Sequence, residues 1–234
     1  FVRQLEWFYK DLDEIWVIAR REERLKELRS RMMLKLRIFE GDLLEQEVYD
    51  KILQTLLDEK PDVRMLVNSA GFGKSGKAVD IDKNTQLEMI DTNCRSLTHM
   101  TLLCIPYMSK GSRIVNMASA AAFCPQPSFA VYAATKSYVL SFSRALRFEL
   151  SKKGIVVTSV CPGPVKTEFF EISGTNVNIL KKASMARADK VVRKALLDVR
   201  KMKEVSVYGT AINGARILTK LFPHRLIINI LAHL

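Results

Sequence analysis

The sequence predicts an α/β fold in which a parallel sheet is covered by helices on both faces. Two observations support this: short runs rich in β-branched residues alternate with longer stretches of helical periodicity, and the runs are almost continuously apolar. Such alternation favours parallel sheets, and continuously apolar strands are typical of sheets buried on both sides. No internal repeat, low-complexity tract or linker divides the 234 residues, so we expect a single domain spanning 1–234.

Five segments are predicted to be strands, and two of the stretches between them have clear helical periodicity. The predicted strands cover residues 15–19, 34–39, 64–68, 113–118 and 155–160. The helical stretches cover residues 43–59 and 131–150, and the chain begins at Phe1 inside a further predicted helix.

A possible proton-transfer site lies in the second helical stretch, where Tyr132 and Lys136 are four residues apart. Positions i and i+4 project from nearly the same helix face, so we expect the Lys136 ammonium near the Tyr132 phenol. A nearby positive charge lowers the pKa of a tyrosine from roughly 10. With the Ser119 hydroxyl thirteen residues upstream, the trio predicts acid/base chemistry between an alcohol and a ketone. Taken alone, the pair also fits an amphipathic helix with an exposed lysine.

Five ordered elements resemble the classical short-chain dehydrogenase/reductases. They are Asn68-Ser-Ala-Gly71, Asp91-Thr-Asn93 at the opening of a predicted helix, Arg113-Ile-Val-Asn-Met-Ala-Ser119, the pair Tyr132 and Lys136, and Cys161-Pro-Gly-Pro-Val-Lys-Thr167. The resemblance implies a Rossmann-like, doubly wound parallel sheet, a nicotinamide cofactor and a homodimer or homotetramer. It also implies that Tyr132 exchanges the proton and Ser119 orients the reacting oxygen. Lys136 would stabilise the phenolate and contact the nicotinamide ribose, and Asn93 would hold a relaying water.

The largest departure from the family lies at the front of the chain. The family places a strand and a glycine-rich turn, T-G-x-x-x-G-x-G, before its first helix, whereas the first glycine here is Gly41. Those glycines let the backbone approach the pyrophosphate at the helix N-terminus. We therefore expect that roughly twenty residues are absent ahead of Phe1, since βα units are about 30 residues or more. The alternative is a truncated chain that cannot bind the cofactor.

The end of the first predicted strand indicates which cofactor would bind. In the family this position meets the adenosine ribose, where an acidic residue suits a free 2′-hydroxyl and arginine suits a 2′-phosphate. Here Arg20 and Arg21 follow the strand, and the first carboxylate after it is Glu22. This predicts NADP(H) over NAD(H), unless the arginines only belong to a solvated helix start. The resemblance assigns further cofactor contacts to Asp42, Asn68, Ala70, Gly71, Pro162, Gly163, Val165 and Thr167. For Asn68, bracing of the sheet is the preferred interpretation.

The residues around the predicted site suggest an apolar substrate, such as a steroid or a ketoacyl compound. The candidate lining residues are Ala121, Phe123, Phe129, Phe169 and Phe170, and residues 168–186 are predicted to form a lid. The same side chains also fit packing against neighbours or a partner subunit.

One match points to a different class of protein. Gly71-Phe-Gly-Lys-Ser-Gly76 fits G-x-G-x-x-G and nearly fits a nucleoside-triphosphate loop, but Ala78 replaces the hydroxyl residue that magnesium requires. A turn after the preceding strand is the preferred interpretation.

Composition adds further expectations. The formal net charge of +12 favours polyanions such as a phosphorylated dinucleotide, and no nucleic-acid-binding motif accompanies it. The four cysteines lack C-x-x-C spacing and the three histidines form no cluster, so we expect reduced thiols, no metal and a cytoplasmic location. The basic, apolar tail over 215–234 could lie on an anionic membrane, although helical packing or subunit contact is the commoner explanation.

Taken together, the sequence predicts an NADP(H)-dependent oxidoreductase that interconverts an apolar ketone and a secondary alcohol. The alternative is a catalytically silent homologue that binds nucleotide or acts as a scaffold.

Overall fold

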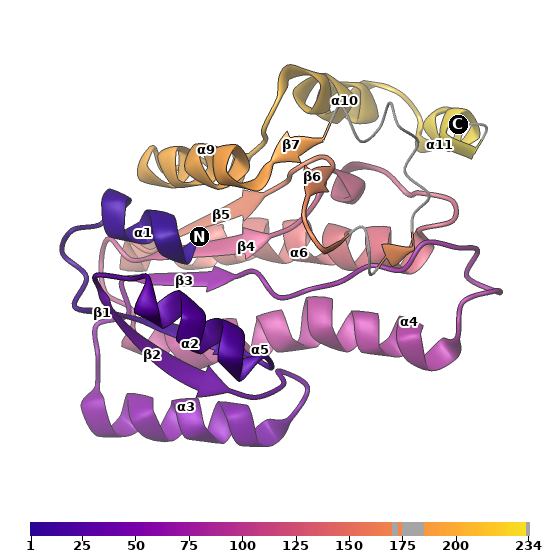
Figure 1. The fold of residues 1–234 in the computed structure, drawn as a ribbon. Coiled ribbons are helices and arrows are strands. Elements are labelled where there is room, and N and C mark those ends of the chain that lie inside the picture. The colour runs from indigo at the N-terminus through magenta and orange to yellow at the C-terminus, as the bar shows by residue number, and fades with distance from the viewer. Residues whose placement is uncertain (170–172, 175–184, 233–234) are drawn as a thin grey trace.

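The computed structural model describes residues 1–169, 173–174 and 185–232, and strands alternate with helices as predicted (Figure 1). All five predicted strands are present within one or two residues: β1 (Glu14–Ala19), β2 (Lys35–Glu40), β3 (Met65–Asn68), β4 (Arg113–Met117) and β5 (Val156–Val160). Three strands of two residues were not predicted, namely β6 (Val165–Lys166), β7 (Ala186–Arg187) and β8 (Val205–Ser206). Every pairing is parallel, which confirms the predicted sheet type.

The helices cover both faces of the sheet. On one face α1 (Val2–Phe8), α2 (Glu22–Ser30) and α9 (Ala188–Arg200) bury Leu5, Leu25 and Leu196 against β1 and β2. On the other face lie α3 (Gln46–Glu59), α4 (Lys83–Ile90), α5 (Ser96–Cys104) and α6 (Ala130–Glu149). Short helical turns η2 (Ile105–Tyr107), η3 (Ala120–Phe123) and η4 (Ser151–Lys153) join elements, and α10 (Thr210–Leu221) and α11 (His224–Ala232) end the described chain.

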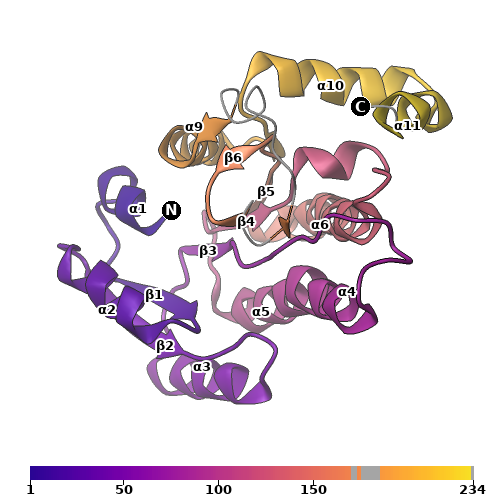
Figure 2. The same ribbon diagram turned by 45° about the vertical axis from the view of Figure 1, so that its right-hand side comes forward.

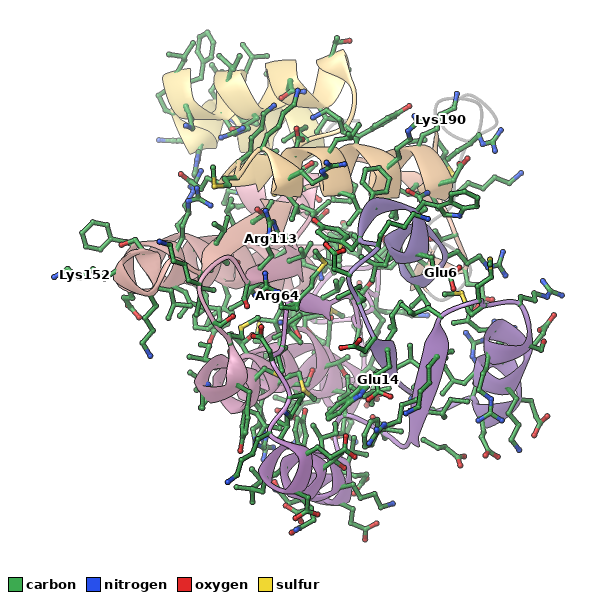
Figure 3. The ribbon with its side chains drawn as sticks, turned by 90° about the vertical axis from the view of Figure 1, so that its left-hand side faces the viewer. Glu6, Glu14, Arg64, Arg113, Lys152 and Lys190 are labelled. Carbon is green, nitrogen blue, oxygen red and sulfur yellow. The ribbon has the colours of Figure 1, made fainter. Side chains whose placement is uncertain are left out.

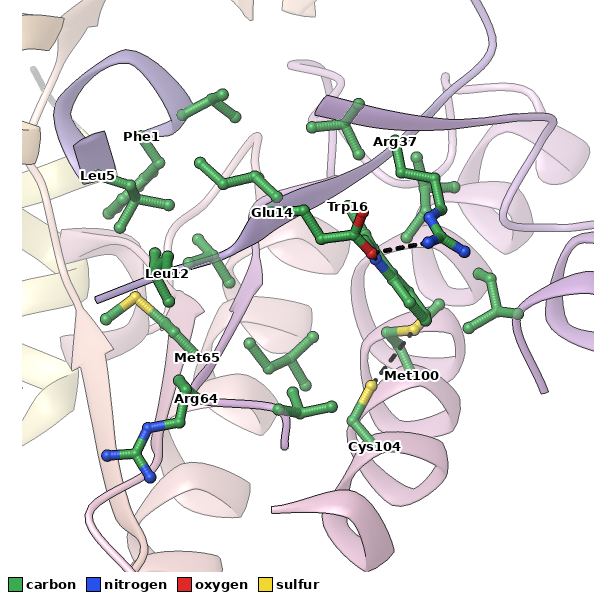
Figure 4. Close-up of a pocket in the computed structure, with 18 of the residues that line it drawn as sticks. Phe1, Leu5, Leu12, Glu14, Trp16, Arg37, Arg64, Met65, Met100 and Cys104 are labelled. Carbon is green, nitrogen blue, oxygen red and sulfur yellow. Dashed lines mark hydrogen bonds and ion pairs between the residues drawn. The ribbon is translucent and has the colours of Figure 1, made fainter. Parts of the chain in front are cut away.

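The sheet is divided into two parts. Among the residues that the structure describes, β1 pairs only with β2, and β3 belongs to a separate sheet in the order β3-β4-β5-β8. Between β1 and β3 lies a cavity of about 1020 Å³, which runs from Asp13 and Arg64 at the amino ends to Asn68 and Ala70 at the carboxyl end. Apolar side chains such as Trp16 and Met65 line it (Figure 4). Two strands of one parallel system therefore face each other across an apolar space without pairing.

One predicted helix start is wrong. Asp91, Thr92 and Asn93 do not open a helix, because they lie inside one: the π-helical turn η1 (Asp91–Arg95) joins α4 directly to α5. The actual start is at Lys83, where the Asp82 carboxylate accepts a hydrogen bond from the Thr85 backbone N–H at 2.8 Å. Aspartate is a favoured residue at such a helix start.

A buried carboxylate ties α9 to the edge of the sheet. Asp198 is 3% exposed; it accepts hydrogen bonds from Lys194 and from the Ser206 hydroxyl (2.8 Å), and its other oxygen lies 3.1 Å from the Lys203 ammonium. Burial on its own raises the pKa of Asp198, but the hydrogen bonds from these three partners outweigh it and hold the pKa below the ordinary value of an aspartate. The carboxylate therefore favours the folded state whenever it is ionised.

We predict that Asp198→Asn lowers the free energy of unfolding by about 1–3 kcal/mol at neutral pH, because buried partners lose a charged acceptor. Since the folded pKa is depressed, this contribution is complete above the unfolded value of about 3.9 and is lost as pH falls through the folded value. Urea unfolding at pH 7 and pH 3 measures it, with the exposed Asp58→Asn as control. Equal stability of the two variants at pH 7 would contradict the prediction.

Candidate active site

The predicted trio comes together at the carboxyl end of β4. Tyr132 and Lys136 lie in the first turns of α6, both almost fully buried, and Ser119 follows β4 and caps η3. The Lys136 ammonium lies 5.8 Å from the centre of the Tyr132 ring and donates a hydrogen bond to the Met117 carbonyl at 2.8 Å. The Ser119 hydroxyl lies close enough to the Tyr132 phenol to lower its pKa. The three groups therefore share one small region, as the spacing predicted.

The charge state of this trio differs from the expectation. Burial raises the pKa of Tyr132 to about 12, and the nearby Ser119 hydroxyl opposes this only partly. Burial lowers the pKa of Lys136 to about 8. The predicted lowering of the tyrosine pKa by Lys136 is thus wrong for this arrangement, because desolvation disfavours the phenolate more strongly. At neutral pH Tyr132 carries its proton, which suits a proton donor.

Asn93 braces the site from the π-helical turn. Its side-chain amide donates to the Phe72 carbonyl at 2.8 Å and to the Thr135 hydroxyl at 3.0 Å, and its oxygen accepts from the Phe72 N–H at 3.0 Å. Thr135 donates in turn to the Tyr132 carbonyl at 2.8 Å. A single widened turn of this kind is common at functional sites. The sequence reasoning missed Thr135, which connects Asn93 to the helix of Tyr132.

Asn68 braces the sheet, as the sequence interpretation preferred. Its buried amide donates to the Thr101 hydroxyl at 2.8 Å and to the Asn116 side-chain oxygen at 2.9 Å on the neighbouring strand. Asn116 donates in turn to the Ser143 hydroxyl of α6 at 2.9 Å. These bonds hold β3, β4 and two helices in fixed positions beneath the site.

The loop after β3 approaches the site closely. Gly71 has a φ of +155°, and a Cβ atom there would lie 2.7 Å from the Asn93 Oδ1 atom and 3.2 Å from the Lys136 Nζ atom. Only glycine fits this position. The triphosphate-loop interpretation gains no support, because no helix begins at Gly76 or Lys77; the next one, α4, starts at Lys83.

The two arginines predicted to bind phosphate, Arg20 and Arg21, directly follow β1. Arg20 pairs with Asp42 at 3.3 Å, so two predicted cofactor residues from different strands lie side by side. Arg21 pairs with Glu168 at 3.0 Å, and Arg24 contacts the same carboxylate. Sequence reasoning missed Glu168 and Arg24, since nothing local links positions so far apart. Each of these three guanidinium groups is thus paired with a carboxylate.

The segment from Pro162 to Thr167 runs beside the trio. The Pro162 carbonyl accepts a hydrogen bond at 2.8 Å from the N–H of Ala120, the residue after Ser119. Val165 begins β6, and Thr167 is exposed just after it. At Gly163 a Cβ atom would lie 2.6 Å from the Ile212 side chain of α10. The predicted cofactor residues of this segment, Pro162, Gly163, Val165 and Thr167, thus form one continuous rim, which α10 touches.

Aromatic side chains enclose the Tyr132 ring. The Phe129 and Phe169 rings lie 4.3 and 5.4 Å from it, and Ala121 is buried in the same apolar cluster. Phe72, which the sequence reasoning missed, joins this cluster. Phe123 packs instead with a neighbouring cluster that includes Ile212. Phe170 and most of the predicted lid over 168–186 lie outside the described residues.

A comparison with known families identifies the class. The family model described as short chain dehydrogenase matches residues 7–177, so the chain belongs to the short-chain dehydrogenase/reductases. It is an oxidoreductase of this type, acting on alcohol or carbonyl groups.

Individual relatives agree with this assignment. An uncharacterized oxidoreductase of Staphylococcus epidermidis is 33% identical over 181 residues, which cover 76% of this chain and 78% of that protein. Serine 3-dehydrogenase of Agrobacterium fabrum is 33% identical over 69% of this chain and 66% of its own length. A short-chain dehydrogenase from Sphingobium yanoikuyae, solved with NADPH, superposes with a TM-score of 0.76 at 25% identity and covers 94% of this chain and 90% of that one.

Proposed function

We propose that this protein is an NADP(H)-dependent oxidoreductase that interconverts an apolar ketone and a secondary alcohol. The observation that carries the proposal is the buried Tyr132 side chain, with Ser119 close to its phenol and the Lys136 ammonium 5.8 Å from the centre of its ring.

In the proposed reaction Tyr132 gives its proton to the carbonyl oxygen of the substrate, and Ser119 donates a hydrogen bond that fixes this oxygen. The positive charge of Lys136 then stabilises the phenolate that remains. Asn93 and Thr135 hold the start of α6 so that the phenol keeps its position. When bound, the nicotinamide supplies the hydride, which is chemistry of the cofactor rather than of the protein.

The residues around the rim fit a phosphorylated dinucleotide. Gly71 leaves space beside Lys136 that a larger residue would fill, and Arg20 and Arg21 supply two guanidinium groups at the end of β1. We assign Asp42 to the adenine side, and Pro162, Gly163, Val165 and Thr167 to the nicotinamide side. The NADPH bound to the Sphingobium yanoikuyae enzyme supports the phosphorylated form.

Cofactor preference gives the first test. We predict that Arg20→Ala together with Arg21→Ala raises the KM for NADPH by roughly 10–100-fold and changes the KM for NADH little, because only NADPH presents a phosphate to a guanidinium fork. Steady-state kinetics with the full-length protein measure both constants. Arg29→Ala, at an exposed position of α2, is the matched control. An equal effect on both cofactors would argue against these arginines as phosphate ligands.

The pH dependence gives a second test. We predict that ketone reduction declines above about pH 8, because Lys136 loses its charge through the pKa of about 8, whereas Tyr132, at about 12, stays protonated. In Lys136→Arg the guanidinium stays charged, so the remaining activity should show no such decline up to pH 10. A decline that persists unchanged in this variant would assign the titration to another group.

An apolar substrate is supported by the cluster of Phe72, Phe129, Phe169 and Ala121 around the reactive ring. A panel of steroid ketones, ketoacyl thioesters and polar substrates, including serine, tests this with the full-length protein and NADPH. We expect the highest kcat/KM for the apolar ketones. Preference for serine or another polar substrate would overturn the substrate class but not the reaction.

The second candidate function is a nucleotide-binding homologue without turnover, which the arrangement of Asn93, Ser119, Tyr132 and Lys136 disfavours. Binding of NADPH with no turnover of any carbonyl in the panel would favour this candidate.

We also propose that a parallel strand followed by a glycine-rich turn fills the cavity between β1 and β3 and completes one Rossmann domain. The support is the lining of the cavity, which includes Glu14 to Ile18 of β1 and all of β3 and extends past β3 to Ala70. Glycines there would let the backbone meet the pyrophosphate.

A homodimer or homotetramer is the proposed assembly. Large apolar side chains exposed on α4, α5 and α6 support it, among them Leu87, Leu102, Tyr138 and Phe148. Light scattering of the purified protein gives the mass directly.

A further inference from the structure

The helices α10 and α11 form an outer layer above the sheet (Figure 2). No residue of α10 is buried, and the helix meets the body through Ile212, which packs beside Phe123 and Gly163. Large apolar side chains on the two helices and the turn between them are exposed; they are Ile217, Leu218, Leu221, Phe222, Leu226 and Ile230. We call these six the C-terminal apolar surface. Such a concentration of exposed apolar side chains on a basic segment marks an interaction site.

The charge of the same segment indicates what kind of partner it would bind. No Asp or Glu follows Glu204 in the sequence, whereas Arg216, Lys220 and Arg225 all do. Within the described part of the chain, none of these three side chains has an ion-pair partner. The segment is therefore both cationic and apolar, which is the composition of helices that lie on anionic bilayers.

We propose that α10 and α11 bind the surface of an anionic lipid bilayer and lie in its interfacial plane. The C-terminal apolar surface would enter the boundary between headgroups and acyl chains, and Lys220 and Arg225 would contact lipid phosphates. A second copy of this chain fits less well, because a symmetric contact would bring like charges together around the apolar residues.

The geometry favours peripheral binding over insertion across the bilayer. In the described residues no helix is long and apolar enough to span a membrane. The two helices have 12 and 9 residues, whereas a spanning helix needs about 20 apolar residues. Since α10 touches Gly163 and Phe123 at the rim of the candidate site, a bound bilayer would lie close to that site.

Vesicle flotation of the full chain tests the proposal and needs neither cofactor nor turnover, so its result is independent of the proposed reaction. We expect binding to phosphatidylcholine vesicles that contain phosphatidylserine, weaker binding at high salt, and little binding to phosphatidylcholine alone. Lys220→Gln with Arg225→Gln should weaken binding by roughly 10–30-fold, since each cation near an anionic surface contributes about 1 kcal/mol. Leu221→Ser with Ile230→Ser should weaken it by at least about tenfold.

The matched control is Lys152→Gln with Lys153→Gln, which removes the same charge from η4, outside α10 and α11; Lys152 projects from the surface there (Figure 3). This variant should bind vesicles like the unmodified chain. Two results would overturn the proposal: no binding to phosphatidylserine vesicles, or equal loss in the control and in Lys220→Gln with Arg225→Gln. Light scattering that shows a dimer abolished by Leu221→Ser, without vesicle binding, would assign the surface to a second copy. Circular dichroism confirms that each variant is folded.

Discussion

Tyr132→Phe is expected to lower the kcat for ketone reduction by roughly 10²–10⁴-fold, the usual contribution of a positioned proton donor. The substitution removes only the hydroxyl, so the contacts of the ring with Phe129 and Phe169 remain. Fold and apolar packing should therefore be preserved, and the KM for NADPH should change little. Steady-state kinetics with the full-length protein and the best substrate of the panel measure both parameters.

The control for this prediction is Tyr138→Phe, six residues further along α6. Tyr138 is 42% exposed, and its hydroxyl shares a 2.8 Å hydrogen bond with Thr98. We expect this variant to keep full turnover. Activity retained in Tyr132→Phe would reject Tyr132 as the proton donor, even with the rest of the site intact.

Extending the chain ahead of Phe1 with an apolar strand and a glycine-rich turn is expected to raise the free energy of unfolding by roughly 3 kcal/mol or more. Each buried Val or Leu contributes about 1.5–3 kcal/mol, while ordering costs about 1–2 kcal/mol for each residue fixed. The unfolding midpoint should then rise by roughly 5–10 °C. The gain arises because the strand would bury apolar surface and pair with both β1 and β3.

Three measurements follow this change. Thermal unfolding gives the midpoint, and hydrogen exchange should show new protection of backbone amides in β1 and β3. Trp16 lines the cavity, so its fluorescence should shift to shorter wavelength, while Trp7 is 75% exposed and should be unaffected. The control is a Gly/Ser-rich extension of equal length. If both extensions stabilise the chain equally, the cavity does not accept a strand.

The long strands could be predicted from sequence because strands buried on both faces are rich in β-branched residues. β6, β7 and β8 could not be predicted in this way, since a strand of two residues is too short to show any periodicity. A helix was wrongly predicted to begin at Asp91, because polar residues such as Asp91 and Asn93 are typical of a helix start. The structure instead inserts them in a continuous helix.

The candidate site was predictable where its residues lie close together in sequence or follow a strand. Tyr132 and Lys136 share one helix face, and Ser119 ends a strand, so local geometry brings them together. Glu168 could not be found in this way, because its pairing with Arg21 joins segments 147 residues apart. The tyrosine pKa was misjudged because spacing reports on the neighbouring charge, whereas the degree of desolvation depends on the complete fold.

The π-helical turn has a consequence for how this site can vary through insertions and deletions. Successive residues of an α-helix are rotated by about 100° around the axis, so removing one residue between Ile90 and Ser96 would regularise the turn and swing Asn93 away from Phe72 and Thr135. The direction in which the Asn93 side chain points therefore depends on the number of residues in the helix as well as on the identity of residue 93. A single-codon deletion there, at any position but 93, would disconnect the loop after β3 from α6 while leaving every side chain named in the site unchanged.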